Sequence, residues 1–78
     1  MVPSNPGVFI LTDAGGLVRY VGKAGRLDLW APEIDPVTWR LFGLTDAVLG
    51  WFEEVPDEAS RAKRMFQLRH TYELDQPP

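Results

Sequence analysis

The chain has 78 residues, so it can form one small domain with an economical hydrophobic core. Hydrophobic residues make up 45% of it, which argues against disorder. The absence of cysteine excludes disulfides, thiolate zinc sites and cysteine nucleophiles, and a single histidine cannot build a multi-histidine metal site. The net charge of -3 disfavours general nucleic-acid binding, which normally requires a basic surface.

The charge is divided unevenly along the sequence. Residues 31–58 carry a net charge of -6, whereas residues 1–30 carry +1 and residues 59–78 carry +2. The basic ends leave a local contact with nucleic acid possible, while the acidic total favours a protein partner.

No apolar run approaches the roughly 20 residues that span a bilayer, so no membrane partner is expected. The first residues also lack the basic start and the apolar stretch of a signal peptide. We therefore expect a cytoplasmic protein.

The first expected elements are the two strands of a β-hairpin. Residues 7–12 and 17–22 are rich in β-branched, aliphatic and aromatic residues, and residues 13–16 supply turn-forming Asp and Gly. Since side chains alternate along a strand, the two faces of the sheet are expected to carry different sets. The first set is Val8, Ile10 and Thr12, and the second is Phe9 and Leu11.

The rest of the chain predicts a helix, a third strand and a longer helix. The first helix is expected to begin at Asp35, because Asp followed by Pro36 is typical of a helix N-terminus, and Gly43 can end it. Residues 47–55 then have strand character. The longer helix is expected after Pro56, where acidic residues occupy the first turn. Its apolar face comprises Ala62, Met65, Phe66, Leu68 and Tyr72.

The order of these elements, β-β-α-β-α, is typical of the α+β class. It predicts a small three-stranded antiparallel sheet covered by helices. Residues 1–78 are expected to form one domain, in which residues 1–6 and 75–78 are frayed tails.

Two segments of the hairpin resemble the paired motifs of the GIY-YIG nuclease family. They are Gly7-Val8-Phe9 and Tyr20-Val21-Gly22-Lys23-Ala24. In that family the second motif lies on the strand that follows the first, and a helix, a strand and a helix come next. The resemblance therefore includes the order of elements over nearly the whole chain, and it implies a GIY-YIG-like fold.

The resemblance also implies a chemistry, namely hydrolysis of phosphodiesters with one divalent metal ion. The family uses a Tyr in each motif, an Arg in the first helix and a metal-binding Glu in the last helix. In this sequence those positions fall on Phe9, Tyr20, Trp30 and Met65. Only Tyr20 is retained, and a thioether does not suit magnesium, which prefers carboxylate oxygens. The resemblance therefore implies a degenerate scaffold without a metal site.

The leading interpretation is a catalytically inactive binding module without a cofactor, whose partner is a protein or a structured nucleic acid. The candidate contact residues are Tyr20, Lys23, Arg26 and Arg69. Arg69 falls within the apolar arc of the last helix. A guanidinium in that position either extends off the packed face or meets an acidic or phosphate partner.

Two alternatives belong to other classes of protein. In the first, the chain is an active magnesium- or manganese-dependent endonuclease with a rearranged metal site. That site would use Glu58 or Glu73, together with Arg69 and Arg26. In the second, the chain is an unrelated small α+β interaction protein, in which the open sheet edges make a homodimer possible.

Overall fold

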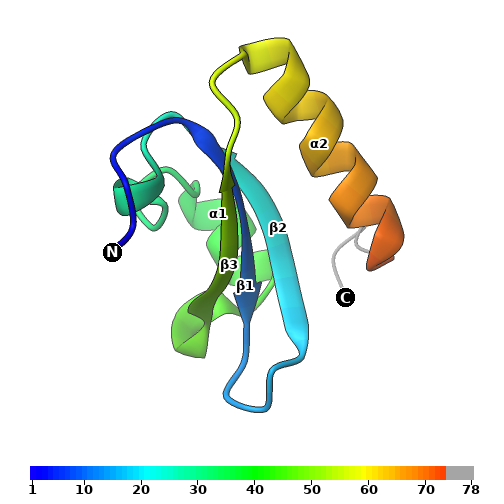
Figure 1. Cartoon of the computed structure of the whole chain (residues 1–78). Coiled ribbons are helices and arrows are strands. Elements are labelled where there is room, and N and C mark those ends of the chain that lie inside the picture. Colours follow the sequence, from blue (N-terminus) through cyan, green and yellow to red (C-terminus); the bar gives the residue numbers. More distant parts are fainter. Residues whose placement is uncertain (74–78) are drawn as a thin grey trace.

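The computed structural model describes residues 1–73 and contains a three-stranded sheet with helices on both sides (Figure 1). In chain order its elements are β1 (Gly7–Thr12), β2 (Val18–Ala24), the 3-10 helix η1 (Leu27–Leu29), α1 (Pro36–Leu41), the 3-10 helix η2 (Leu44–Asp46), β3 (Val48–Glu54) and α2 (Glu58–Thr71). The α+β class and the order β-β-α-β-α are confirmed, and the structure adds a 3-10 turn on each side of α1. The expected C-terminal tail, 75–78, lies outside the described residues.

Residues 1–6, which were expected to fray, form neither helix nor strand but make backbone hydrogen bonds to η1. The N–H of Leu27 donates to the carbonyl of Asn5 at 3.0 Å. The N–H of Asp28 donates to the carbonyl of Pro3, also at 3.0 Å. These bonds hold the segment that precedes β1 against η1.

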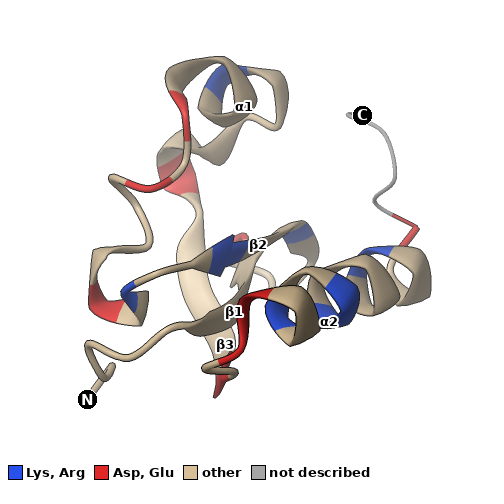
Figure 2. Ribbon diagram, turned by 90° about the horizontal axis from the view of Figure 1, so that it is seen from above, with Lys and Arg blue, Asp and Glu red and all other residues tan. Residues whose placement is uncertain are grey.

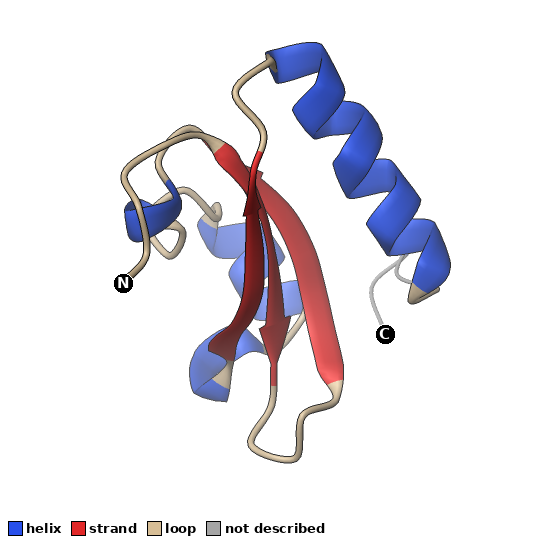
Figure 3. Cartoon of the chain, in the orientation of Figure 1, coloured by secondary structure: helices blue, strands red, loops and turns tan. Residues whose placement is uncertain are grey.

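β1 is the central strand and pairs antiparallel with β2 on one side and with β3 on the other (Figure 3). In the turn between β1 and β2, the carboxylate of Asp13 accepts hydrogen bonds from the backbone N–H groups of Gly15 and Leu17. Gly16 has a φ of 85°, a conformation that glycine adopts without strain. The turn predicted for residues 13–16 is therefore confirmed.

The two faces of the sheet carry different layers. α2 covers one face, and η1, α1 and η2 lie on the other (Figures 1 and 3). The aliphatic layer, under α2, consists of Val8, Ile10, Val21, Met65 and Leu68. The aromatic layer, on the opposite face, has as buried members Phe9, Leu11, Tyr20, Ala24, Leu27, Ile34 and Leu44, with partly buried Trp30, Trp39, Phe42 and Phe52 packed against them. The alternation predicted for residues 8–11 is thus confirmed.

Both α-helices begin where the local sequence chemistry predicts. At the start of α1, the carboxylate of Asp35 accepts hydrogen bonds from the hydroxyl and the N–H of Thr38. At the start of α2, the carboxylate of Asp57 accepts one from the N–H of Ser60. These bonds favour the charged carboxylates and lower the pKa of each Asp below its ordinary value. Within residues 1–73, no helix has the length and apolar composition needed to cross a membrane.

The packed face of α2 is narrower than the sequence pattern suggests. Met65 and Leu68 are buried against the sheet as expected, but Phe66 is 61% exposed and Tyr72 is 43% exposed. α2 packs mainly against β2 and β1, so a single stripe of its surface is covered. The prediction that Phe66 and Tyr72 share the packed face is therefore wrong.

Candidate functional site

Three of the four positions that the GIY-YIG resemblance singles out lie together in the aromatic layer. Phe9 is 1% exposed, and its ring centroid lies 6.1 Å from that of Tyr20 and 5.9 Å from that of Trp30. Phe9 has no hydroxyl and Trp30 has no charge, so the Tyr20 hydroxyl is the one titratable group of the three. Packed aromatic rings thus occupy the place where the resemblance implies groups that move protons and bind phosphate.

The fourth of these positions, Met65, lies on the opposite face of the sheet. It is 7% exposed and packs in the aliphatic layer beside Val8, Ile10 and Leu68. These hydrocarbon side chains supply no oxygen ligand, so the position does not fit the magnesium ion that the resemblance implies. Within residues 1–73, no group of three or more His, Asp or Glu side chains is arranged to hold a metal ion.

The two carboxylates of the rearranged-site alternative are far apart. Glu58 begins α2 and Glu73 follows its last turn, so the helical rise separates them by about 20 Å. Both side chains are exposed. A metal site of this kind would therefore use one of these carboxylates without the other.

Arg69 reaches from α2 around the free edge of β2 to the aromatic layer. Its Nε donates a hydrogen bond to the carbonyl of Val21 at 2.9 Å, and its Nη2 donates to the hydroxyl of Tyr20 at 3.3 Å. The guanidinium carbon also lies 5.4 Å from the centroid of the Tyr20 ring, within the range of a cation–π interaction. The partners of Arg69 are thus a backbone carbonyl and a tyrosine hydroxyl, and neither is a carboxylate.

The other contact candidates, Lys23 and Arg26, do not form a uniformly basic patch. Arg26 pairs with Asp28 at 2.7 Å, and the hydrogen bond between them raises the pKa of Arg26. Lys23 is exposed and lines a polar hollow of about 280 Å³ together with Arg61 and two glutamates. Figure 2 shows basic residues along β2 and α2 and acidic ones near the end of β3 and the start of α2. Charges of both signs therefore mix on this side of the molecule.

The aromatic layer extends toward solvent through two indole rings. Trp30 contacts Phe9 and also stacks on Trp39 of α1, with centroids 6.3 Å apart and ring planes 15° apart. Both tryptophans are half-buried. The buried ring of Phe9 is thereby connected, through Trp30, to a tryptophan at the surface.

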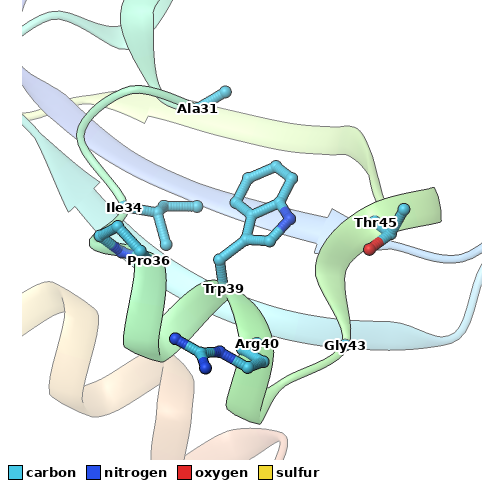
Figure 4. Close-up of a pocket in the computed structure, with 7 residues that line it drawn as sticks. All are labelled: Ala31, Ile34, Pro36, Trp39, Arg40, Gly43 and Thr45. Atoms are coloured by element: carbon cyan, nitrogen blue, oxygen red, sulfur yellow. The ribbon is translucent and has the colours of Figure 1, made fainter.

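Trp39 forms one wall of an open pocket of about 570 Å³ beside α1 (Figure 4). The residues that line it are Ala31, Ile34, Pro36, Trp39, Arg40, Gly43 and Thr45. Figure 4 shows the indole of Trp39 between Ile34 and Thr45, with Arg40 extending from the same helix. Gly43 has a φ of 61°, a left-handed conformation that turns the chain after α1 and leads it back past the tryptophan. The lining is mostly apolar, so the pocket suits an apolar side chain.

Arg40 supplies the positive charge at this pocket, and its side chain is exposed. It is also the sole basic residue in the segment 31–58. Two nearby carboxylates already have partners, since Glu33 accepts two backbone N–H bonds from the loop after β2 and Asp35 caps α1. An acidic group on a ligand would therefore be attracted to Arg40.

The pocket residues Trp39 and Arg40 were not among the site residues predicted from the sequence. One local signal was present, because an Asp-Pro helix start places a Trp and an Arg side by side in a short helix. The opposite wall at Thr45 depends on the turn at Gly43, and no comparable sequence pattern indicates it.

Comparison with known proteins assigns no family. A scan of the chain against protein-family models finds no match, and a search of curated proteins finds none either.

Proposed function

We propose that this chain is a noncatalytic binding module for a protein partner, and that the pocket beside Trp39 receives an apolar side chain of that partner. The observation that carries the proposal is the pocket itself, an open and mostly apolar space of about 570 Å³ with an exposed arginine on its lining. Sites that bind ligands commonly have this size and this combination of apolar walls and few polar groups.

The side chains at the family's catalytic positions support binding over hydrolysis. General acid–base catalysis requires groups that take up or release a proton, and Phe9, Trp30 and Met65 have none. Tyr20 is 9% exposed, and its hydroxyl already has Arg69 as a partner. In this proposal the chain keeps a GIY-YIG-like scaffold that has lost its nuclease chemistry. That relationship, and the cytoplasmic location expected from the sequence, remain predictions.

A protein partner suits the charges around the pocket better than a nucleic acid does. The lining of the pocket includes one basic side chain, Arg40, whereas binding to a phosphate backbone normally draws on several Lys and Arg side chains. Trp and Arg are among the side chains that most often dominate the energy of protein–protein binding, and Trp39 and Arg40 lie side by side here. The preferred ligand is therefore a protein segment with an apolar side chain close to an acidic one.

The noncatalytic part of the proposal is tested by incubating the purified chain with plasmid DNA, branched DNA and RNA in the presence of magnesium or manganese. We expect no cleavage above the buffer control, because the family's catalytic positions lack the required groups. Cleavage that disappears in Tyr20→Phe would contradict the proposal, since this variant removes just the one retained hydroxyl.

The binding part is tested by selecting displayed random peptides on the immobilised chain and measuring a selected synthetic peptide by fluorescence anisotropy. We expect the selected peptides to combine an apolar residue with Asp or Glu. Thr45→Trp fills the pocket from an exposed position, so it should weaken binding about tenfold or more, and Arg40→Ala should weaken it by a smaller factor.

Lys63→Ala provides the matched control, because Lys63 is an exposed residue of α2 on the other side of the sheet. It should bind the peptide as the wild-type chain does. Equal affinity in the wild type, Thr45→Trp and Arg40→Ala would place the binding site elsewhere and contradict the proposal.

A further inference from the structure

The two edges of the sheet are protected differently. At the free edge of β2, the carbonyl of Val21 accepts the hydrogen bond from Arg69, so the peptide groups of Val21 point away from β1. The direction of hydrogen bonding alternates along an antiparallel strand, so Tyr20 and Gly22 bond to β1 instead. An arginine thus covers the position at which another strand could pair with β2.

The same alternation identifies the open groups of β3. Because the peptide groups of Val21 point away from β1, its partner Ile10 directs its own peptide groups to the other side, toward Trp51 of β3. The N–H of Val55, which bonds at 2.9 Å to the segment before β1, continues this pattern. Phe52 therefore directs its N–H and C=O away from the sheet. Outside the strand ladder, no hydrogen bond within residues 1–73 involves the backbone of Phe52.

Apolar side chains surround this open edge. On the α2 side of β3, Trp51 is 39% exposed and Val48 is 53% exposed, because α2 packs mainly against the other two strands. A shallow hollow of about 390 Å³ lies at the same strand, lined by Val2, Leu49, Gly50, Trp51 and Phe52. An exposed apolar edge strand is a template for pairing with a further strand.

We propose that β3 pairs antiparallel with β3 of a second copy of this chain, about a two-fold axis at Phe52, so that two three-stranded sheets join into one. In this register Phe52 lies opposite the partner's Phe52, and Trp51 lies opposite the partner's Glu53. Glu54 lies opposite the partner's Gly50. No acidic residue of β3 then faces an acidic residue across the axis.

The charges on the α2 side of β3 favour a second copy over an unrelated strand. The Nε of Arg64 lies 2.9 Å from the Oε1 of Glu53, and its guanidinium carbon lies 5.9 Å from the Trp51 ring centroid. Because Trp51 and Glu53 exchange places across the axis, each Arg64 gains the partner's Glu53 as a second neighbour of opposite charge. The α2 side of β3 thus carries both a positive group, Arg64, and a negative group, Glu53, which a two-fold interface between identical surfaces requires.

A bulge in β3 limits the length of the joined ladder. The register between β1 and β3 shifts between Ile10 and Leu11, which leaves Gly50 as an extra residue. The paired segment therefore extends from Gly50 to Glu54, and the dimer should be weak enough to dissociate on dilution. None of the residues that line the pocket beside Trp39 takes part, so this inference is independent of the proposed function.

Sedimentation equilibrium from low micromolar to millimolar concentration tests the inference on the full chain. The mean mass should rise from 8.8 kDa toward twice that value. Amide hydrogen exchange at Phe52 and Glu54 should slow as the concentration rises, because their N–H groups become bonded in the dimer. A monomer mass throughout would overturn the inference. So would a dimer in which these two amides exchange equally fast at all concentrations.

Two variants and a control locate the interface. Trp51→Glu places acidic residues opposite one another across the axis, and Glu54→Pro removes an N–H that β1 does not use. Each should keep the monomer mass while circular dichroism shows an intact fold. Phe66→Glu makes the same apolar-to-acidic change on α2 and should dimerise like the wild type. Dimers in both edge variants, or a monomer in the control, would overturn the inference.

Discussion

The two faces of this sheet are built on the same strands but end in different surfaces. On one face, Val8 and Ile10 pack beneath α2, a helix of 14 residues that closes the aliphatic layer over β1 and β2. On the other face, Phe9 and Leu11 pack beneath three short elements, and these leave the pocket beside Trp39 open. A long regular helix covers its layer evenly, whereas short elements joined by turns leave space between them.

In the proposed function, recognition therefore depends on the aromatic layer alone, whereas core stability depends on both layers. Changes in the aliphatic layer should alter folding without a specific effect on binding, because no lining residue of the pocket lies there. Changes in the aromatic layer should affect both, because its rings connect the buried Phe9 with the pocket at Trp39.

The largest effect is expected from Met65→Glu, which places a carboxylate at the position where the GIY-YIG resemblance implies a metal ligand. The side chains of the aliphatic layer that pack around Met65 are hydrocarbon, so burying a carboxylate among them should cost on the order of 3–5 kcal/mol, much of the stability of so small a domain. Urea unfolding at neutral pH, followed by circular dichroism with and without magnesium, measures this change. Met65→Leu is the matched control and should cost less than about 1.5 kcal/mol.

A folded Met65→Glu chain that magnesium stabilises would contradict the account of this layer. That result would mean that other oxygen ligands can reach position 65, and the aliphatic layer would then be a metal site with one ligand missing.

An intermediate effect is expected from Gly22→Ala, which adds a methyl group to the aromatic layer. The new Cβ would lie 2.7 Å from Cζ of Phe9 and 2.7 Å from Cε2 of Tyr20, so both rings must move. Such overpacking costs about 1–3 kcal/mol, and the shift of Phe9 should also weaken peptide binding through Trp30. Thermal unfolding and fluorescence anisotropy measure the two effects.

Gly25→Ala is the control for that change, because its Cβ would meet nothing closer than Oε1 of Glu33 at 3.6 Å. It should leave stability and binding nearly unchanged. If the two glycine variants behaved alike, the tight packing of the aromatic layer at Gly22 would be disproved.

The smallest effect should come from acid titration of the two helix caps, one on each side of the sheet. Hydrogen bonds from Thr38 and Ser60 lower the pKa of Asp35 and of Asp57 below the ordinary value of 3.8. When the pKa of a carboxyl is lower in the folded chain than in the unfolded chain, the carboxylate stabilises the fold. This stabilisation is complete at a pH above the unfolded-chain pKa, and it is lost as the pH falls through the folded-chain pKa. The Tm should therefore decline below a pH of about 3.8.

Replacing both caps with Asn separates their contribution from that of the other carboxylates. Asn also caps helices but does not titrate, so the chain with Asp35→Asn and Asp57→Asn should lose less Tm in acid than the wild type. An identical decline in both chains would show that these caps do not link stability to pH.

Features that depend on neighbouring residues could be predicted from the sequence. Asp35 and Asp57 start their helices through bonds to residues three positions ahead. The faces of β1 follow from strict alternation, which places Phe9 and Ile10 in different layers. The fold class follows from the order of such elements.

Features that depend on distant residues could not be predicted in this way. Helical periodicity placed Phe66 on the packed face, but the width of that face depends on where α2 lies over the sheet. The partner of Arg69 is a carbonyl 48 residues earlier in the chain. The pocket exists because Thr45 returns past Trp39 after the turn, a relation that no local pattern contains.

The central claim, that this domain binds a protein segment at the pocket beside Trp39, is tested most directly by an NMR titration. A selected peptide is added to the isotope-labelled chain, and the shift of each amide and indole N–H is followed. The largest shifts are expected at Trp39, Arg40 and Thr45, with little change at Lys23 and Arg69. The largest shifts at Lys23 and Arg69, with none at the pocket, would contradict it.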